Sequence, residues 1–183
     1  MTLAEMEKKV LKLIEEYDKE NQTEYTSDPD IATKIKDVIN QIQYELARIK
    51  KIPDYIEKSV TKGKLIRFAD IEDGVYQIDV VKGIKYEYKA HGTIIKCLED
   101  GVLEIEYFKY PKRITEDNAA NYKFELSPDV LEIMPYGVAG DILKSDVSNA
   151  YGNVYAQRYE QMKQQLDIRY NTGSIEIAGG IEW

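Results

Sequence analysis

The sequence predicts an α+β protein: a helical bundle formed by N- and C-terminal helices, with an inserted antiparallel β-sheet or sandwich module and an extended C-terminal arm. Two changes of hydrophobic period predict this arrangement. Apolar residues recur every three or four positions up to about Lys51, alternate with polar residues after about Gly63, and return to helical spacing after Ser127. We therefore expect N-terminal helices in residues 1–61, the β module in 62–126, a C-terminal helical pair completing the bundle in 127–170, and the arm in 171–183.

Two amphipathic helices are expected before the β module. The first covers residues 3–17, and its apolar face is formed by Leu3, Met6, Val10, Leu13, Ile14 and Tyr17. The second begins after Asp28, a good N-cap, with Pro29 in the first helical position, and continues to about Lys51, before Pro53. Its apolar face is formed by Ile31, Ile35, Val38, Ile39, Ile42, Leu46 and Ile49.

Five segments of the middle region alternate apolar and polar residues: LIRF, VYQIDVV, IKYEYKA, TIIKC and VLEIEYFKY. Three glycine-containing pairs between them predict tight hairpin turns: Lys82-Gly83, His91-Gly92 and Asp100-Gly101. We expect a meander or small sandwich of four to six strands, which Pro111 ends because proline cannot donate to a sheet. The segment YKFEL, residues 122–126, is a candidate for one more strand.

The segment 127–166 has the longest helical signal in the chain. Ser127 is a good N-cap and Pro128 suits the first turn, while Pro135 is expected to kink or divide the helix because it lacks an N–H group. Gly137 and Gly140 allow another backbone to approach closely. After a polar turn, a second helix places Tyr151, Tyr155, Tyr159, Met162 and Leu166 on one face, which predicts an antiparallel helical pair.

Composition narrows the possible functions. The chain has 183 residues, of which 15 are tyrosines. Its net charge is −8, so it lacks the surplus of basic residues that an ordinary nucleic-acid-binding protein has. An acidic surface still suits a conduit that DNA slides through, although negative charge also simply aids solubility. The single cysteine excludes an internal disulfide, and neither a signal peptide nor a membrane span is expected.

The patterns LEIMPYGVAGDILKSD and AYGNVYAQRYEQMKQQL resemble the C-terminal helical pair of tailed-bacteriophage head–tail connector proteins, also called adaptor or head-completion proteins. The order of the β segments, the YFKYP strand and the ITED linker is also similar to that family. The resemblance implies a non-enzymatic virion structural protein in the neck, assembled in the host cytoplasm. It implies a ring, a dodecamer in this family, that lies beneath the portal and extends the DNA channel toward the tail.

The resemblance also implies the partners: other copies of the chain, the portal protein, the next tail or neck component, and DNA that passes through without sequence-specific binding. No membrane partner and no cofactor are expected. The residues that we expect at oligomer or portal interfaces are Tyr136, Gly137, Gly140, Tyr151, Tyr155, Tyr159, Ile175, Ile177 and Trp183. The last three belong to the arm, where Ser174 to Ala178 alternate like a strand. This strand could lie against its own domain, add to a neighbour's sheet, or fray in an isolated monomer.

Catalytic and metal-binding patterns are weak in this sequence. His91 in a predicted turn is the one histidine, so neither a Ser-His-Asp arrangement nor a Cys97–His91 pair has a supporting motif. Two Cys or His residues cannot supply a zinc site. A basic cluster of Arg48, Lys50, Lys51, Lys58, Lys62 and Lys64 could meet an acidic subunit surface or DNA, but its position after a helix already explains it.

Two alternatives to the connector hypothesis remain. The chain could be a cytosolic module that uses its β-hairpins to bind a peptide or protein, in which case it would stay monomeric at high concentration. A small hydrolase is the other alternative, and it would have to depend on His91.

Overall fold

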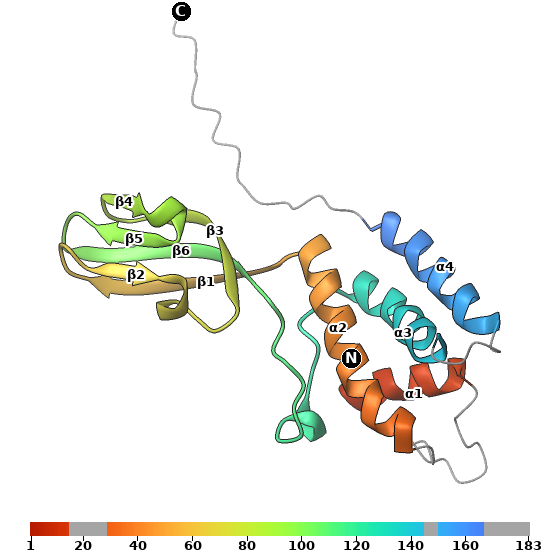
Figure 1. Ribbon diagram of the computed structural model, residues 1–183. Helices are drawn as coiled ribbons and strands as arrows, with labels where there is room; N and C mark the ends of the chain where they lie inside the picture. Colours follow the sequence, from red (N-terminus) through yellow and green to blue (C-terminus); the bar gives the residue numbers. More distant parts are fainter. Residues whose placement is uncertain (15–28, 145–149, 167–183) are drawn as a thin grey trace, which may run out of the picture.

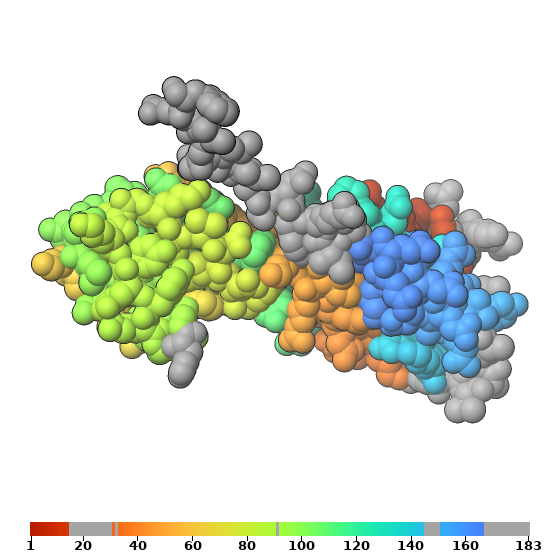
Figure 2. All heavy atoms as spheres, turned by 90° about the horizontal axis from the view of Figure 1, so that it is seen from above, coloured from red at the N-terminus to blue at the C-terminus, as the bar shows by residue number. Residues whose placement is uncertain are grey.

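The computed structural model describes residues 1–14, 29–144 and 150–166, and it has the α+β fold that the sequence predicts (Figure 1). Within these residues, the four α-helices gather in one lobe and the β-strands in another, and the two lobes lie at opposite ends of the space-filling view (Figure 2). Each lobe has its own hydrophobic core. The predicted arm, 171–183, lies outside the described residues.

The helical lobe joins segments from both ends of the chain. It contains α1 (Leu3–Leu13), α2 (Pro29–Ile49), α3 (Pro128–Leu143) and α4 (Ala150–Gln164). A capping box between Thr2 and Glu5 begins α1, whose expected last turn lies outside the described residues. Side chains from all four helices share one core, so the predicted packing of the N-terminal helices on the C-terminal pair is confirmed.

Helix α3 is the central helix of this lobe. It begins after Ser127, which holds the predicted N-cap position without a side-chain capping bond, and continues past Pro135 to Leu143. Of the two outcomes expected at Pro135, a kink or a division, the division is therefore wrong. Pro135 is itself buried, as are Leu131 and Ala139. Because α1, α2 and α4 all pack on α3, burial on nearly every side holds the helix together although Pro135 provides no N–H group for the carbonyl of Leu131.

The β lobe is a small sandwich of two three-stranded antiparallel sheets. The first sheet has the order β1-β6-β3, formed by Ile52–Val60, Gly101–Lys109 and Val75–Lys82. The second has the order β2-β5-β4, formed by Leu65–Arg67, Ile94–Cys97 and Tyr86–Lys89. Both sheets contribute to one core, including Ile66, Val81, Ile95, Leu103 and Ile105.

The β module begins at Ile52 rather than at residue 62, because β1 pairs along its whole length with β6. Pro53 was expected only to end the preceding helix, but it lies within this strand. Proline is tolerated there because β1 is at the edge of its sheet. The strand was not recognised from the sequence because Asp54 and Lys58 occupy inward positions of β1. Charged residues there interrupt the alternation of apolar and polar residues that predicts a strand.

The expected turns are partly wrong. His91-Gly92 lies in the short 3-10 turn Ala90–Gly92, which joins β4 to its partner β5 as a hairpin. Lys82-Gly83 and Asp100-Gly101 instead connect strands of different sheets, so the connectivity is a sandwich and not a meander. The candidate strand 122–126 forms only an isolated bridge, between Thr2 and Lys123.

A buried polar network fixes the segment that returns from the β lobe to α3. Asn40 of α2 donates to the carbonyl of Ile114 (3.0 Å) and accepts from its backbone N–H (2.8 Å). Gln43 donates to Asn40 (2.8 Å), and the hydroxyl of Tyr122 donates to Gln43 (2.9 Å). Asn40 and Gln43 are 4% and 0% exposed, so these bonds satisfy polar groups that water does not reach.

Aromatic residues connect the two lobes. The ring of Tyr110, just after β6, lies 4.5 Å from Tyr76 of β3 and 5.5 Å from Tyr44 of α2, measured between centroids. Arg48 of α2 donates to the hydroxyl of Tyr110 at 3.0 Å. We call Tyr44, Arg48, Tyr76 and Tyr110 the lobe junction.

Candidate functional site

The contact between α3 and α4 depends on two glycines. A Cβ atom at Gly137 would lie 2.9 Å from the ring of Tyr159, and one at Gly140 would lie 2.9 Å from the backbone nitrogen of Ala156. The close approach predicted at these glycines is therefore confirmed, and the approaching backbone is that of the chain's own α4. Tyr159 is buried in this contact, with 5% of its surface exposed.

The outer side of α4 carries a stripe of side chains at three- and four-residue spacing. We call it the α4 stripe, and it consists of Tyr151, Val154, Tyr155 and Arg158. Tyr151 is 62% exposed and Val154 is 54% exposed, which are the largest exposed fractions among the large apolar residues that the structure describes. An exposed apolar group of this kind is typical of a surface that meets a partner.

The inner edge of the α4 stripe is anchored to the rest of the helical lobe. The hydroxyl of Tyr155 donates to the backbone carbonyl of Leu13 in α1 at 3.0 Å. The guanidinium of Arg158 lies 4.4 Å from the ring centroid of Tyr136, a cation–π distance. Tyr155 and Arg158 thus contact α1 and α3, while Tyr151 and Val154 are more than half exposed.

The predicted interface residues fall into three groups. Gly137, Gly140 and Tyr159 are covered by contacts within the chain. Tyr136, Tyr151 and Tyr155 lie at or beside the α4 stripe, where an interface role remains a prediction. The third group lies outside the described residues: Ile175, Ile177 and Trp183.

A second polar cluster lies where the β lobe meets the segment that returns to α3. The ammonium of Lys109 lies 2.7 Å from Asp54, 3.3 Å from Glu72 and 3.5 Å from Glu125. Its side chain is 9% exposed. One buried cation therefore joins the first strand, the loop before β3 and the returning segment, and we call these four side chains the Lys109 cluster.

The Lys109 cluster is built to keep its charges. The hydrogen bond from Lys109 lowers the pKa of Asp54 below its ordinary value. Burial opposes the charge of Lys109, but hydrogen bonds to Asp54 and Glu72 outweigh it, so the pKa of this lysine is raised. Both groups stay ionised near neutral pH, which suits a structural ion-pair network better than proton transfer.

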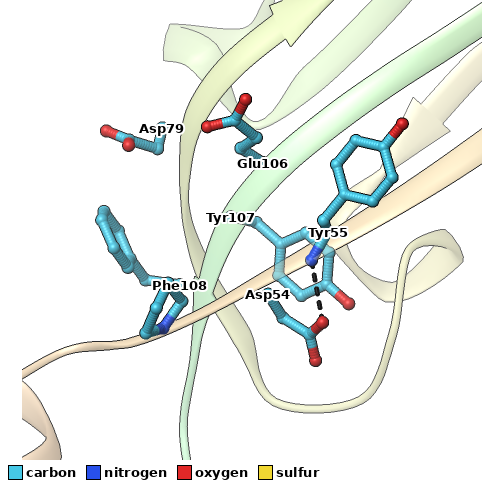
Figure 3. A pocket seen from close by; sticks show the side chains of 7 residues that line it. Asp54, Tyr55, Asp79, Glu106, Tyr107 and Phe108 are labelled. Carbon is cyan, nitrogen blue, oxygen red and sulfur yellow. Dashed lines mark hydrogen bonds between the residues drawn. The ribbon is translucent and has the colours of Figure 1, made fainter. Parts of the chain in front are cut away.

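The sheet β1-β6-β3 has a shallow hollow of about 340 Å³ (Figure 3). Its lining combines carboxylates with aromatic rings: Pro53, Asp54, Tyr55, Asp79, Glu106, Tyr107 and Phe108. Tyr55 is 47% exposed, and its hydroxyl lies 2.5 Å from the carboxylate of Glu57, which raises the pKa of Tyr55 to about 12. The hollow offers surface for contact, with acidic groups at its rim.

The structure places Cys97, one of the residues considered for catalysis, away from solvent. Cys97 is buried in the core of the β lobe, and burial raises the pKa of its thiol, which disfavours the reactive thiolate. The backbone of His91 lies in the turn after β4. Within residues 1–14, 29–144 and 150–166, no three His, Cys, Asp or Glu side chains are placed to hold a metal, and no helix has the length and apolarity to cross a bilayer.

The predicted basic cluster is largely used within the chain. Lys50 forms an ion pair with Asp129 at 2.6 Å, next to the start of α3. Lys51 lies 4.6 Å from the ring centroid of Phe108, and Arg48 belongs to the lobe junction. These contacts favour the structural explanation of the cluster over a nucleic-acid surface.

Sequence reasoning missed three features that organise the molecule: the strand β1, the Asn40–Gln43 network and the Lys109 cluster. A signal for the network was present, because Gln43 interrupts an otherwise apolar face beside Ile39, Ile42 and Leu46. Neither the models of known protein families nor the curated proteins compared with the chain match it. The fold order and the exposed surfaces are therefore the observations that bear on function.

Proposed function

We propose that the chain is a non-catalytic structural protein of a tailed-phage virion, a head-to-tail adaptor that forms a ring beneath the portal and extends the DNA channel to the tail. The observation that carries this proposal is the order of the fold. Helices from both ends of the chain share one core, and a β sandwich is inserted between them. This is the arrangement that the connector resemblance implies.

The surfaces of the molecule support a role in assembly. The α4 stripe presents Tyr151 and Val154 on a firmly packed helix, which suits contact with a neighbouring copy or with the portal. The β lobe projects away from the helices, so it can reach a second neighbour or the next neck component (Figure 1). The net charge of −8 suits a channel wall along which DNA slides without being held.

Electron microscopy of the chain mixed with portal rings from the same phage tests the proposal. We expect closed rings of the chain stacked on one end of the portal. Purified virions are expected to contain the chain in the neck, and virions that lack it altogether would overturn the proposal. A monomer in the absence of portal is compatible with it, because many ring components assemble only on their platform.

The alternative, a cytosolic module that binds a peptide or protein, is favoured by one observation. The hollow on the sheet β1-β6-β3 combines the exposed ring of Tyr55 with acidic side chains, as in a site for a basic peptide. Such a module would remain monomeric at high concentration, would bind without portal and would be absent from virions.

A further inference from the structure

The two outer faces of the β sandwich carry opposite charge. The outer face of the sheet β1-β6-β3, which we call the acidic face, presents Glu57, Glu104 and Glu106. Asp79, in the irregularity of β3, lines the same hollow as Tyr55 and Glu106 and belongs to this face (Figure 3). Glu57 and Glu104 lie directly opposite each other in adjacent strands. Opposed like charges in a sheet cost stability, and a partner of opposite charge would offset that cost.

Two lysines, Lys82 and Lys51, balance only part of the charge of these four carboxylates. Lys82 pairs with Glu106 at 3.1 Å, and the side chains are 60% and 42% exposed. Lys51 donates to Gln77 at 2.8 Å and lies 4.6 Å from the ring centroid of Phe108, at the end of this face. Glu57 accepts from the hydroxyl of Tyr55, which brings no charge. Two apolar side chains lie among the carboxylates, Tyr55 at 47% exposed and Val102 at 46%.

The outer face of the sheet β2-β5-β4, which we call the basic face, presents Arg67, Lys89 and Lys96. Arg67 and Lys89 flank Ile94 from the two neighbouring strands, while the alternate positions Ile66 and Ile95 point into the core. Glu87 pairs with Lys89 at 3.0 Å and with Lys96 at 3.2 Å, which leaves an excess of positive charge. Leu65 lies on this face, opposite Lys96, and is 44% exposed.

The two faces cannot neutralise each other within one molecule, because the core of the sandwich separates them. A second copy of the chain presents the complementary face. Each face also has apolar side chains within its charged surroundings, which is the composition of a protein–protein contact. Since the two surfaces differ, their contact is head-to-tail, and repetition of a head-to-tail contact gives a ring or an open filament.

We propose that the acidic face of one copy docks on the basic face of the next copy. This inference rests on the proposed ring function and names the contact that would connect neighbours around it. The chain as a whole has a net charge of −8, so copies repel at long range. At about 0.15 M salt that repulsion is screened beyond about 8 Å, whereas charges in direct contact still attract.

Charge reversal tests the pairing. The acidic-face variant carries Glu57→Lys and Glu104→Lys, and the basic-face variant carries Arg67→Glu and Lys89→Glu. All four positions are on the sandwich surface, and circular dichroism checks that each variant is folded. Association is measured by sedimentation velocity of the whole chain over a concentration series and by electron microscopy on portal rings.

We expect wild-type association to weaken at least tenfold in each reversed variant and to return when the two variants are mixed. The variant with all four substitutions should regain self-association, because both faces are then reversed together. A control with Asp37→Lys and Glu132→Lys changes the net charge as much as the acidic-face variant does but acts on exposed positions of the helical lobe. An equal loss in this control would assign the effect to net charge and overturn the pairing.

The outcomes separate this inference from the proposed function. Rings on the portal that neither reversal disturbs would overturn the pairing and leave the ring proposal intact. Association that depends on the faces but yields only open filaments, with or without portal, would support the pairing and overturn the ring. A chain that stays monomeric and forms no ring on the portal would overturn both.

Discussion

Replacing Lys109 by methionine would remove the one cation of the Lys109 cluster while keeping an apolar stem of similar length. The ammonium lies 2.7 Å from Asp54, and its side chain is 9% exposed. Without it, Asp54, Glu72 and Glu125 would converge with no counter-charge. We expect the free energy of unfolding to fall.

The size of this loss in stability depends on how much water can reach the carboxylates that have lost their counter-charge. Removing one partner of a fully buried ion pair costs about 3–5 kcal/mol. Asp54 and Glu72 are 39% and 33% exposed, so water solvates part of the charge that is left behind. We therefore expect a loss of about 2–3 kcal/mol, below the fully buried range.

Lys82→Met is the matched control, because it removes a lysine from a neighbouring strand of the same sheet. Lys82 pairs with Glu106 at 3.1 Å, but the two side chains are 60% and 42% exposed. An exposed pair of this kind contributes about 0–1 kcal/mol. Urea denaturation followed by circular dichroism measures both variants, and with an m-value of about 2 kcal/mol/M the Lys109→Met midpoint should fall by about 1–1.5 M.

The pH dependence gives the prediction a second test. The pKa of Asp54 is lowered, chiefly by the hydrogen bond from Lys109. This pair therefore stabilises the fold at pH values above 3.8, the ordinary pKa of an aspartate. That contribution disappears as the pH falls through the lower pKa of the folded state. In the Lys109→Met variant, acid instead relieves the repulsion among three carboxylates.

The stability difference between wild type and Lys109→Met should therefore shrink as the pH falls from 7 to below about 4. The pKa of Lys109 is raised, so its contribution to stability has the opposite pH dependence. This contribution is complete at pH values below 10.5, the ordinary pKa of a lysine, and disappears as the pH rises through the pKa of the folded state. A stability difference that is constant from pH 7 to pH 3, or no larger than that of Lys82→Met, would show that Lys109 does not hold the three carboxylates together.

Three further predictions concern packing, the buried network and assembly. Gly140→Ala should lower the free energy of unfolding, measured by thermal unfolding, by about 1 kcal/mol. The new Cβ would lie 2.9 Å from the α4 backbone, and this overpacking exceeds the gain in helix propensity. A stabilised variant would contradict the contact. Asn40→Leu should cost about 1–3 kcal/mol in urea denaturation, since it leaves both backbone groups of Ile114 without their partner; an unchanged midpoint would argue against the network. Val154→Asp should leave the fold intact but reduce ring formation on the portal about tenfold. Asn153→Asp, at the neighbouring position, adds the same charge and serves as the control. Equal effects of the two variants would exclude the α4 stripe as an interface.

The strands that the sequence predicted are those with clean alternation. In β6, Leu103, Ile105 and Tyr107 face the core between two glutamates, and the structure confirms this pattern. Strand β1 escaped prediction because its inward positions include Asp54 and Lys58, whose polar ends find partners only in the folded chain. A polar residue that is satisfied by a distant lysine or carbonyl looks, in sequence, like a residue of a solvated loop.

Strand pairing was the other limit. The pairs Lys82-Gly83 and Asp100-Gly101 have the composition of hairpin turns, yet each leads from one sheet to the other. Both glycines have a positive φ, at 100° and 151°, so the sequence correctly marks a reversal of the chain. The sheet that the chain enters after the reversal depends on how the two sheets pack over one core. A local sequence pattern does not contain this information. The same limit applies to Gly137 and Gly140, where the close approach was predictable but its partner was not.

The lobe junction ties these observations to assembly. The two cores are separate, so the orientation of the helices relative to the sandwich depends on contacts such as Tyr110 with Tyr44 and Tyr76. If neighbours meet through the faces of the sandwich, the junction determines where each helical lobe stands around the ring. Tyr110→Ala should then leave face-dependent association unchanged while it disturbs regular rings on the portal, because it loosens the link between the lobes and not the contact between copies.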